Sequence, residues 1–357
     1  MKGESVMEKY SVLMSLYIKE KPEYLDLAIK SMVEQTLKPD EIVIVKDGPI
    51  TDELQAVLDK YNAAYPELFN IVGYEKNRGL GLALNFGLEH CRNELVARMD
   101  TDDISKPERC EKQVKAFEEH PENSIIGSAV DEFYGTPDNV TARRVVPCNY
   151  REIYQFAKKR SAFNHPSVMY RKSKVLEFEG YANLRRNQDV DLFGRMLFGG
   201  CKAMNFEESL LRFRSDENLA KRRKSWENTW SYIDTINRFR KMGYSSFMDV
   251  AIIACAQTVM YLMPISVQNW LYKNLDNITG KFKVVSFDNL AIEQLNVKRL
   301  MSDKEWDEFY QGDDGSSTYY IDMVERKFAR SSTAPFDKRY DLLDSVDDMF
   351  EVIRKEK

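Results

Sequence analysis

The feature that most constrains this chain is an alternation of strand-like and helix-like segments over residues 10–104. Apolar runs predict buried strands at 11–16, 41–45, 69–72 and 94–99, and helical patterns fill 22–36, 52–61 and about 79–91 between them. Pro22 suits the first turn of a helix, and residues 46–49 have the composition of a turn. Such alternation favours right-handed crossovers onto a parallel sheet. We therefore predict an α/β fold with a mostly parallel sheet flanked by helices.

The composition narrows the class of protein. Of 357 residues, 43% are hydrophobic and 31% are charged, which is typical of a globular protein. The net charge of -5 argues against a broad basic surface for nucleic acid. The five cysteines are scattered without a CxxC pair, and residues 1–10 are polar, so the sequence predicts reduced thiols, no secretory signal and a cytoplasmic protein.

Acidic residues follow two of the predicted strands. Asp47 comes after the second strand, and Asp100, Asp102 and Asp103 come directly after the fourth. Ligands of open α/β sheets bind beyond the carboxyl ends of the strands. We therefore expect these side chains to lie on one rim of the sheet.

The three carboxylates within residues 100–103 repel one another unless something compensates their charge. A hard divalent cation would relieve this repulsion and leave positions for phosphate oxygens. The alternative is a helix start with acidic first-turn residues. The residues alone leave both interpretations open.

The remainder of the chain is more mixed. Short strands are predicted at 124–129, 141–146 and 167–170, a helix at 189–198, and helical structure from about 221 to 275. We predict one domain over 1–220. A helical region at 221–279 follows, and residues 280–357 form a polar extension of unknown role that would suit a small helical appendage.

Taken together, these segments resemble glycosyltransferase family 2, whose members have the Rossmann-like GT-A fold. The resemblance covers about residues 10–275, and residues 280–357 lie outside it. It implies that the domain over 1–220 is catalytic, with a nucleotide-binding half at 1–104 and an acceptor half at 105–220. It is closest to the bacterial enzymes that build capsule, exopolysaccharide and O-antigen repeats. The matching segments are 11–17 with Glu20, 31–36, 39–45, Asp47-Gly48, 77–81 with 83–85, 97–103, 164–166, 188–192 and Arg222-Arg223.

The resemblance implies a binding site for a nucleotide sugar. Asp47 would read a uracil or thymine base, backbone groups around Ser15–Tyr17 would frame it, and Glu20 and Arg78 would belong to the same site. Asp102 would bind Mn²⁺ or Mg²⁺ directly. Asp100 would hold the ribose or support the metal, and Asp103 would orient the turn or touch the donor sugar. A solvated loop arginine remains an alternative for Arg78.

The resemblance also implies a catalytic base for inverting transfer. Asp189 matches the aspartate of the family's Glu-Asp pair, with Gln188 departing from the usual glutamate. Asp191 is a rival that we expect to point elsewhere at helical spacing. The alternative is that Asp189 and Asp191 are first-turn residues stabilised by the helix dipole.

Two further groups carry open alternatives. His165 would contact the donor sugar or a phosphate, or would be a structural hydrogen-bonding residue. Arg222 and Arg223 would bind the diphosphate, an anionic lipid or only water. The apolar segment 250–275 would rest in a membrane interface or pack on the catalytic domain.

These features predict an inverting, metal-dependent transfer of a hexose or N-acetylhexosamine from a UDP-sugar, with UDP-Gal, UDP-GlcNAc and UDP-GalNAc as the leading donors. The acceptor would be a growing, lipid-linked polysaccharide repeat unit, and the enzyme would contact the inner face of the plasma membrane peripherally. Two alternatives are a non-catalytic nucleotide-sugar-binding protein and a sugar nucleotidyltransferase. The second lacks support because residues 17–20 contain no glycine for a triphosphate-binding loop.

Overall fold

The computed structural model describes residues 7–215 and 225–264, residue 267, and the backbone of four short segments at 285–286, 317–322, 327–332 and 341–343. The chain divides into two compact units, Met1–Met263 and Pro264–Lys357, each considered by itself. The domain boundaries expected near residues 220 and 279 both fall outside the described residues, and that division stays a prediction.

The first unit is built on a nine-stranded sheet with the order β3-β2-β1-β4-β8-β6-β9-β5, and β7 pairs with β6. Its strands are β1 (Tyr10–Leu16), β2 (Glu41–Asp47), β3 (Phe69–Tyr74), β4 (Leu95–Met99), β5 (Ile104–Ser105), β6 (Asn123–Tyr134), β7 (Val140–Arg144), β8 (Met169–Arg171) and β9 (Lys202–Ser215). Its helices are α1 (Pro22–Val33), α2 (Asp52–Ala64), α3 (Leu80–His90), α4 (Arg109–Glu119), α5 (Tyr150–Ala157), α6 (Lys172–Glu177), α7 (Gln188–Phe198), α9 (Trp226–Met242) and α10 (Phe247–Leu262), with a 3-10 turn η1 at His165–Ser167.

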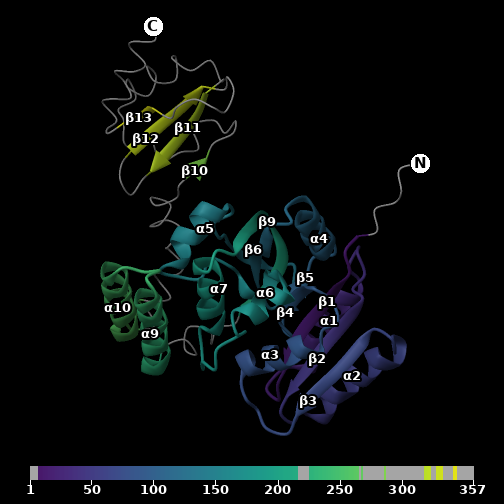
Figure 1. The fold of residues 1–357 in the computed structure, drawn as a ribbon. Helices are drawn as coiled ribbons and strands as arrows, with labels where there is room; N and C mark the ends of the chain where they lie inside the picture. Colours follow the sequence, from purple (N-terminus) through teal and green to yellow (C-terminus); the bar gives the residue numbers. More distant parts are fainter. Residues whose placement is uncertain are drawn as a thin grey trace, which may run out of the picture. The chain divides into compact units, whose positions relative to one another are not determined.

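The first four strands confirm the predicted alternation. Strands β3, β2, β1 and β4 are parallel to one another. Helices α1 and α2 cover one face of this half of the sheet, and α3 covers the other (Figure 1). Because β1, β2 and β4 are buried on both faces, these three strands read as nearly continuous apolar runs.

Two predicted helix ends in this half are wrong. The helix expected over 52–61 continues to Ala64. The helix expected over 22–36 ends at Val33. The Gln35 side chain donates to the carbonyls of Ser31 and Lys106, and the Thr36 amide donates to the Pro107 carbonyl. These hydrogen bonds to a distant segment replace the last helical turn.

The second half of the sheet adds antiparallel pairing. Strand β8 runs antiparallel to both β4 and β6, and β5 runs antiparallel to β9. The long strand β9 lies parallel to β6 and was missing from the predicted elements. The sheet is therefore mixed, and its parallel half is formed by the segments that were predicted to bind the nucleotide.

A buried polar network joins the two halves. The Arg109 guanidinium donates to the carbonyls of Arg98 in β4 and of Val168, and the Gln113 amide donates to the carbonyls of Ile126 in β6 and Ser167. Arg109 and Gln113 are both buried, and Arg109 Nε also donates to Gln113 Oε1 at 3.1 Å. The network ties β4, β6 and η1 to one helix, α4.

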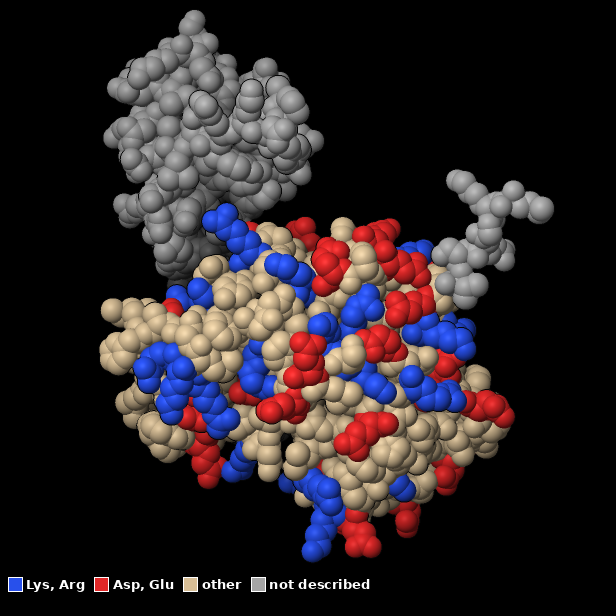
Figure 2. Space-filling model, viewed as in Figure 1, with Lys and Arg blue, Asp and Glu red and all other residues tan. Residues whose placement is uncertain are grey.

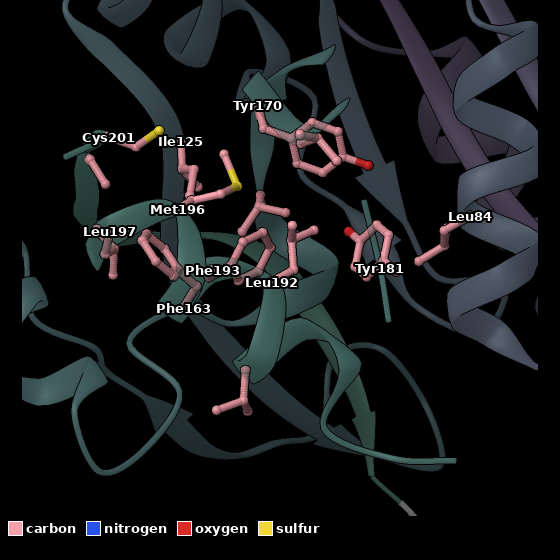
Figure 3. Close-up of a cluster of buried hydrophobic side chains, with 14 of the residues drawn as sticks. Leu84, Ile125, Phe163, Tyr170, Tyr181, Leu192, Phe193, Met196, Leu197 and Cys201 are labelled. Carbon is pink, nitrogen blue, oxygen red and sulfur yellow. The ribbon is translucent and has the colours of Figure 1, made fainter. Parts of the chain in front are cut away.

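Helix α7 packs into the core through a face of large apolar side chains. Figure 3 shows Leu192, Phe193 and Met196 of α7 beside Ile125 and Phe163. On the same helix, a Cβ at Gly194 would overlap the ring of Phe239 in α9. The absence of a side chain at Gly194 therefore allows α9 to approach α7 closely.

The second unit contains a four-stranded antiparallel sheet with the order β10-β11-β12-β13. These strands are β10 (Val285–Ser286), β11 (Ser317–Asp322), β12 (Lys327–Ser332) and β13 (Asp341–Leu343). The described segments of the polar extension are thus strands, and the small helical appendage is not found among them.

Candidate active site

The acidic turn lies directly beyond the carboxyl end of β4, as the sequence predicted. Asp100, Asp102 and Asp103 each offer a carboxylate oxygen, and these oxygens lie within 4.8 Å of one another. Asp103 is fully buried, whereas Asp100 and Asp102 are half-buried. The turn therefore concentrates three carboxylates around one small space.

Burial and the neighbouring negative charges raise the pKa values of two of these carboxyl groups. Burial, followed by the charges of Asp100 and Glu20, raises the pKa of Asp102 to about 7. Burial and then the charges of Asp102 and Asp100 raise the pKa of Asp103 well above its ordinary range. Negative charge at this turn is thus under-compensated by the groups of the protein itself.

Neighbouring segments hold the turn in place. The Arg214 amide at the end of β9 donates to Asp103 Oδ1 at 2.8 Å, and its Nε donates to the Asp102 carbonyl at 2.8 Å. The Thr101 hydroxyl donates to Glu20 Oε2 at 3.0 Å, which links the turn to the segment after β1. The shape of the turn is therefore fixed by β9 and by the β1–α1 connection.

This oxygen-only arrangement fits a hard divalent cation. Asp103 Oδ2 is buried and has no hydrogen-bond partner among the described residues, so one carboxyl oxygen of the turn is left unsatisfied. Mn²⁺ and Mg²⁺ prefer carboxylate oxygens and keep open positions for phosphate. The residues present are those that such an ion needs.

Arg98 is a charged residue inside the core beside this turn. Its side chain is 1% exposed and forms an ion pair with Asp100. Its Nε and Nη1 atoms are buried without a partner among the described residues. The Arg98 charge acts on Asp102 and Asp103, and it also acts on Asp189. Arg98 therefore shares one electrostatic environment with the acidic turn and the predicted base.

Asp189 lies in the first turn of α7 and is half-buried. Burial raises its pKa, while the backbone amides of Val190 and Asp189 and the Arg98 charge oppose this rise. The charge of Asp100 also acts on Asp189, which places the predicted base near the acidic turn. A carboxylate with a raised pKa is a stronger proton acceptor.

The neighbours of Asp189 have other partners. Asp191 is buried and accepts from Arg195 Nε at 2.8 Å, so the rival base is occupied by a structural ion pair. Gln188, where the family has glutamate, is buried and lies against Gly81 at the start of α3, and its Oε1 has no hydrogen-bond partner within the described part of the chain. Gln188 therefore helps to seat α7 against the nucleotide-binding half.

Asp47 organises the loop after β3. Its carboxylate accepts from four donors, namely the Tyr74 hydroxyl, the Asn77 amide group and the backbone amides of Arg78 and Gly79. The turn at Gly48 lies against this loop, because a Cβ there would be 2.7 Å from the Asn77 nitrogen. A role for Asp47 in reading the base stays a prediction, and that role would share a carboxylate that already holds the loop.

The other predicted donor-site residues take varied positions. Ser15 is half-buried at the end of β1 and Tyr17 is exposed beyond it. The exposed Arg78 guanidinium stacks 4.6 Å from the centre of the Tyr74 ring. Arg222 and Arg223 lie outside the described residues. The binding roles of these residues stay predictions.

His165 is held by an aromatic pocket. Its Nε2 lies 2.9 Å from the Tyr181 hydroxyl, and its ring contacts those of Tyr181 and Phe193. Burial, followed by the charge of Arg98, lowers the pKa of His165 well below its ordinary value, so the ring is neutral at pH 7. A neutral imidazole suits a hydrogen bond to a sugar better than an ion pair with phosphate.

Sequence reasoning assigned no role to Arg98 or Arg214, although both touch the acidic turn. Arg98 stands within the matching segment 97–103, in an otherwise apolar strand, and a charge there signals a special environment. Arg214 lies in a strand that the sequence pattern did not reveal.

Comparison with known proteins identifies the family of the chain. Residues 11–183 match the model of the family described as "Glycosyl transferase family 2". The chain is 38% identical over 266 residues to the amylovoran biosynthesis glycosyltransferase AmsE of Erwinia amylovora, covering 74% of this chain and 98% of that protein. It is 35% identical over 269 residues to the UDP-Gal:alpha-D-GlcNAc-diphosphoundecaprenol beta-1,3-galactosyltransferase of Escherichia coli, covering 75% and 96%.

The fold also has a match among solved structures. The structure of S. aureus TarS 1–349 in complex with UDP-GlcNAc aligns with a TM-score of 0.52 at 15% identity, over 78% of this chain and 76% of that one. The predicted GT-A-like fold, with a helical region after the sheet, is confirmed. The sequence matches cover nearly the whole length of the two relatives, and the acidic turn lies within the matched residues. The chain is therefore a glycosyltransferase and belongs to glycosyltransferase family 2.

Proposed function

We propose that this enzyme catalyses inverting, metal-dependent transfer of a hexose or N-acetylhexosamine from a UDP-sugar to a lipid-linked acceptor during synthesis of a cell-surface polysaccharide. The observation that carries the proposal is the shared environment of the acidic turn and Asp189. Arg98 is paired with Asp100 and acts electrostatically on Asp189. A diphosphate bound at the turn would therefore lie near a residue able to accept a proton.

In this proposal Asp189 takes the proton of the acceptor hydroxyl as its oxygen bonds to the anomeric carbon of the donor. The bond from that carbon to the phosphate oxygen breaks on the opposite face, its electron pair leaves with UDP, and the configuration inverts. Mn²⁺ or Mg²⁺ held by Asp102, with Asp100 and Asp103 in support, would neutralise the charge of the leaving diphosphate. Arg98 keeps Asp100 in position and offsets part of the acidic charge.

The donor and acceptor classes rest on the relatives. The name of the E. coli relative gives UDP-Gal as its donor and a GlcNAc-diphosphoundecaprenol as its acceptor. That protein is 35% identical over 75% of this chain, so we propose UDP-Gal first and UDP-GlcNAc or UDP-GalNAc next. We also propose a cytoplasmic location with peripheral contact at the inner face of the plasma membrane, where such an acceptor would be reached.

We also propose that Arg222 and Arg223 bind the diphosphate. Arg214 is fixed to the acidic turn by two hydrogen bonds. Arg222 follows it by eight residues, which span at most about 29 Å when fully extended. Chain length therefore allows both arginines to reach the diphosphate, where guanidinium groups would add bidentate hydrogen bonds.

The test is a transfer assay with each of the three UDP-sugars, a synthetic lipid-linked GlcNAc-diphosphate acceptor, and Mn²⁺, Mg²⁺ or EDTA. We expect metal-dependent product whose new linkage has the anomeric configuration opposite to that of the donor, as read by NMR. Asp102→Asn and Asp189→Asn should each remove transfer. Asp138→Asn, which changes a 93% exposed carboxylate, is the matched control.

Two outcomes would point to the alternative functions. Donor binding by calorimetry without transfer to any acceptor would favour a nucleotide-sugar-binding protein. Release of pyrophosphate from a nucleoside triphosphate would favour a sugar nucleotidyltransferase. A retained anomeric configuration, or full activity of Asp189→Asn, would contradict the proposed mechanism.

A further inference from the structure

The helical hairpin formed by α9 and α10 has an unusual outer surface. The exposed residues of α10 recur at helical spacing along one side, and every one of them is apolar or a small thiol: Met248, Ile252, Cys255, Ala256, Val259 and Leu262. The first residue of the helix, Phe247, is 76% exposed. A surface helix of a globular protein normally turns its polar side to water, and α10 does the reverse.

No charged residue interrupts this apolar stripe. The single charged residue of α10 is Asp249, which completes a capping box with Ser246 and forms an ion pair with Lys159. The opposite side of α10 contacts the core through Val250 and Ile253, which are only partly buried. The stripe is therefore a continuous apolar surface about one helix long.

Aromatic residues mark the end of the hairpin where α9 begins and α10 ends. Trp226 contacts both Trp230 and Tyr261, with ring centres 6.4 and 5.5 Å apart. Trp226 and Trp230 are also exposed. Tryptophan and tyrosine favour the level of the lipid headgroups, where one part of the ring is apolar and another can bind water.

Basic residues mark the other end, at the turn between the helices. Arg240 and Lys241 lie exposed in the last turn of α9, just before Phe247. Lys and Arg side chains gather over the region of α9 in Figure 2. Each carboxylate of the two helices is already ion-paired within the described chain: Glu227 to Arg185, Asp234 to Arg238 and Asp249 to Lys159. The charges of the hairpin without an ion pair among the described residues are those of Arg240 and Lys241, and both are positive.

We propose that the outer surface of the α9–α10 hairpin docks in the plane of an anionic lipid bilayer. The sixteen residues of α10 would extend about 24 Å, less than the roughly 30 Å hydrocarbon core, and no helix among the described residues is long and apolar enough to cross a membrane. The stripe would enter the interface while Arg240 and Lys241 meet anionic headgroups. A second copy of the chain would bring no unpaired carboxylate of its hairpin to these two cations.

Docking in this orientation connects the membrane to the catalytic helix. The Ser231 hydroxyl, one residue after Trp230, donates to the Arg186 carbonyl and accepts from Asn187 Nδ2, and Asn187 lies two residues before Asp189. Trp230 at the bilayer surface would thus lie beside residues 186–187, which directly precede the helix that carries Asp189. The inference builds on the proposed lipid-linked acceptor, whose sugar would emerge next to this segment.

The test is flotation of the purified full chain with two kinds of vesicle: phosphatidylglycerol with phosphatidylethanolamine, and phosphatidylcholine alone. We expect binding to the anionic vesicles and weak binding to the neutral ones. Ile252→Glu and Val259→Glu should each lower vesicle affinity by about tenfold. Leu176→Glu is the matched control, because Leu176 and Ile252 are both 48% exposed.

The charge of the hairpin is tested separately. Arg240→Gln and Lys241→Gln should each weaken binding to anionic vesicles about fivefold. Lys30→Gln, in the last turn of α1, should leave binding unchanged. Unaltered thermal melting of all variants would show that the fold is intact.

Three results would overturn the proposal: no flotation of the wild-type chain with anionic vesicles, equal effects of Ile252→Glu and Leu176→Glu, or a dimer that Ile252→Glu converts to monomer while vesicle binding persists. Transfer to a water-soluble acceptor analogue is measured in parallel. Loss of all transfer with vesicle binding retained would count against the proposed function and leave the docking surface supported.

Discussion

The raised pKa of Asp102 makes the stability of the metal-free enzyme depend on pH. Its pKa is about 7 in the folded protein, against an ordinary value of 3.8. Between these values the folded protein keeps a proton that the unfolded chain has lost, so folding takes up a proton. The free energy of unfolding therefore falls as pH rises, by about 1.4 kcal/mol per pH unit, and the contribution of Asp102 is fully lost above pH 7.

The magnitude follows from the difference between the two pKa values. About three pKa units correspond to about 4 kcal/mol. Because Asp102 is half-buried and water screens part of its charge, we expect a loss of about 2–4 kcal/mol between pH 4 and pH 8. In a domain of this size such a loss lowers the melting temperature by several degrees.

Asp102→Asn isolates this effect, because an amide stays neutral at every pH. In EDTA the variant should match the wild type near pH 4 and exceed its free energy of unfolding by about 2–4 kcal/mol at pH 8. Urea denaturation at four pH values measures the difference, and Asp138→Asn controls for loss of a surface carboxylate. Adding Mn²⁺ at pH 8 should stabilise the wild type and not Asp102→Asn. A difference between wild type and variant that is constant across pH would refute the reasoning.

Three further predictions concern separate parts of the molecule. Asp189→Asn should lower kcat by about 10²–10⁴-fold while the thermal shift produced by the donor is kept, and loss of that shift would show that Asp189 binds rather than catalyses. The Asp47 carboxylate accepts hydrogen bonds from four groups, and Asp47→Asn replaces one of its two oxygens by an amide group. We therefore expect the free energy of unfolding, measured with denaturant, to fall by about 1–3 kcal/mol and the nucleotide sugar to bind more weakly. Gly194→Ala should cost about 1–3 kcal/mol because the new methyl group overlaps Phe239, and an unchanged melting temperature would show that α9 can move away freely.

The first half of the fold was predictable because both faces of its sheet are buried. Strand β1 sends Val12 and Met14 into one core and Leu13 into the other, so the sequence shows an unbroken apolar run. The acidic turn followed from its position after such a run. These local signals needed no knowledge of distant contacts.

The second half was less predictable because its elements depend on distant partners. Strand β9 contains Glu207 and Glu208 and its pairing with β6 shifts register, which breaks the alternation that would identify a strand. Arg98 reads as a surface residue by type, yet it is buried beside Asp100. Only the assembled structure shows that one guanidinium serves both the turn and the surroundings of Asp189.

The network centred on Arg109 and Gln113 bears on how this enzyme can be re-engineered. An apolar layer tolerates exchange of side chains of similar total volume. A guanidinium sealed in the core needs each of its carbonyl acceptors, and Arg109 takes them from Arg98 on one side and Val168 on the other. A chimaera joined between residues 104 and 105 would take the Arg98 carbonyl from one protein and the Arg109 side chain with the Val168 carbonyl from another. These hydrogen bonds would then have to form between two backbones that come from different proteins. New donor preference should therefore be sought by point changes at the rim of the sheet, and exchange of whole halves between relatives should yield insoluble protein.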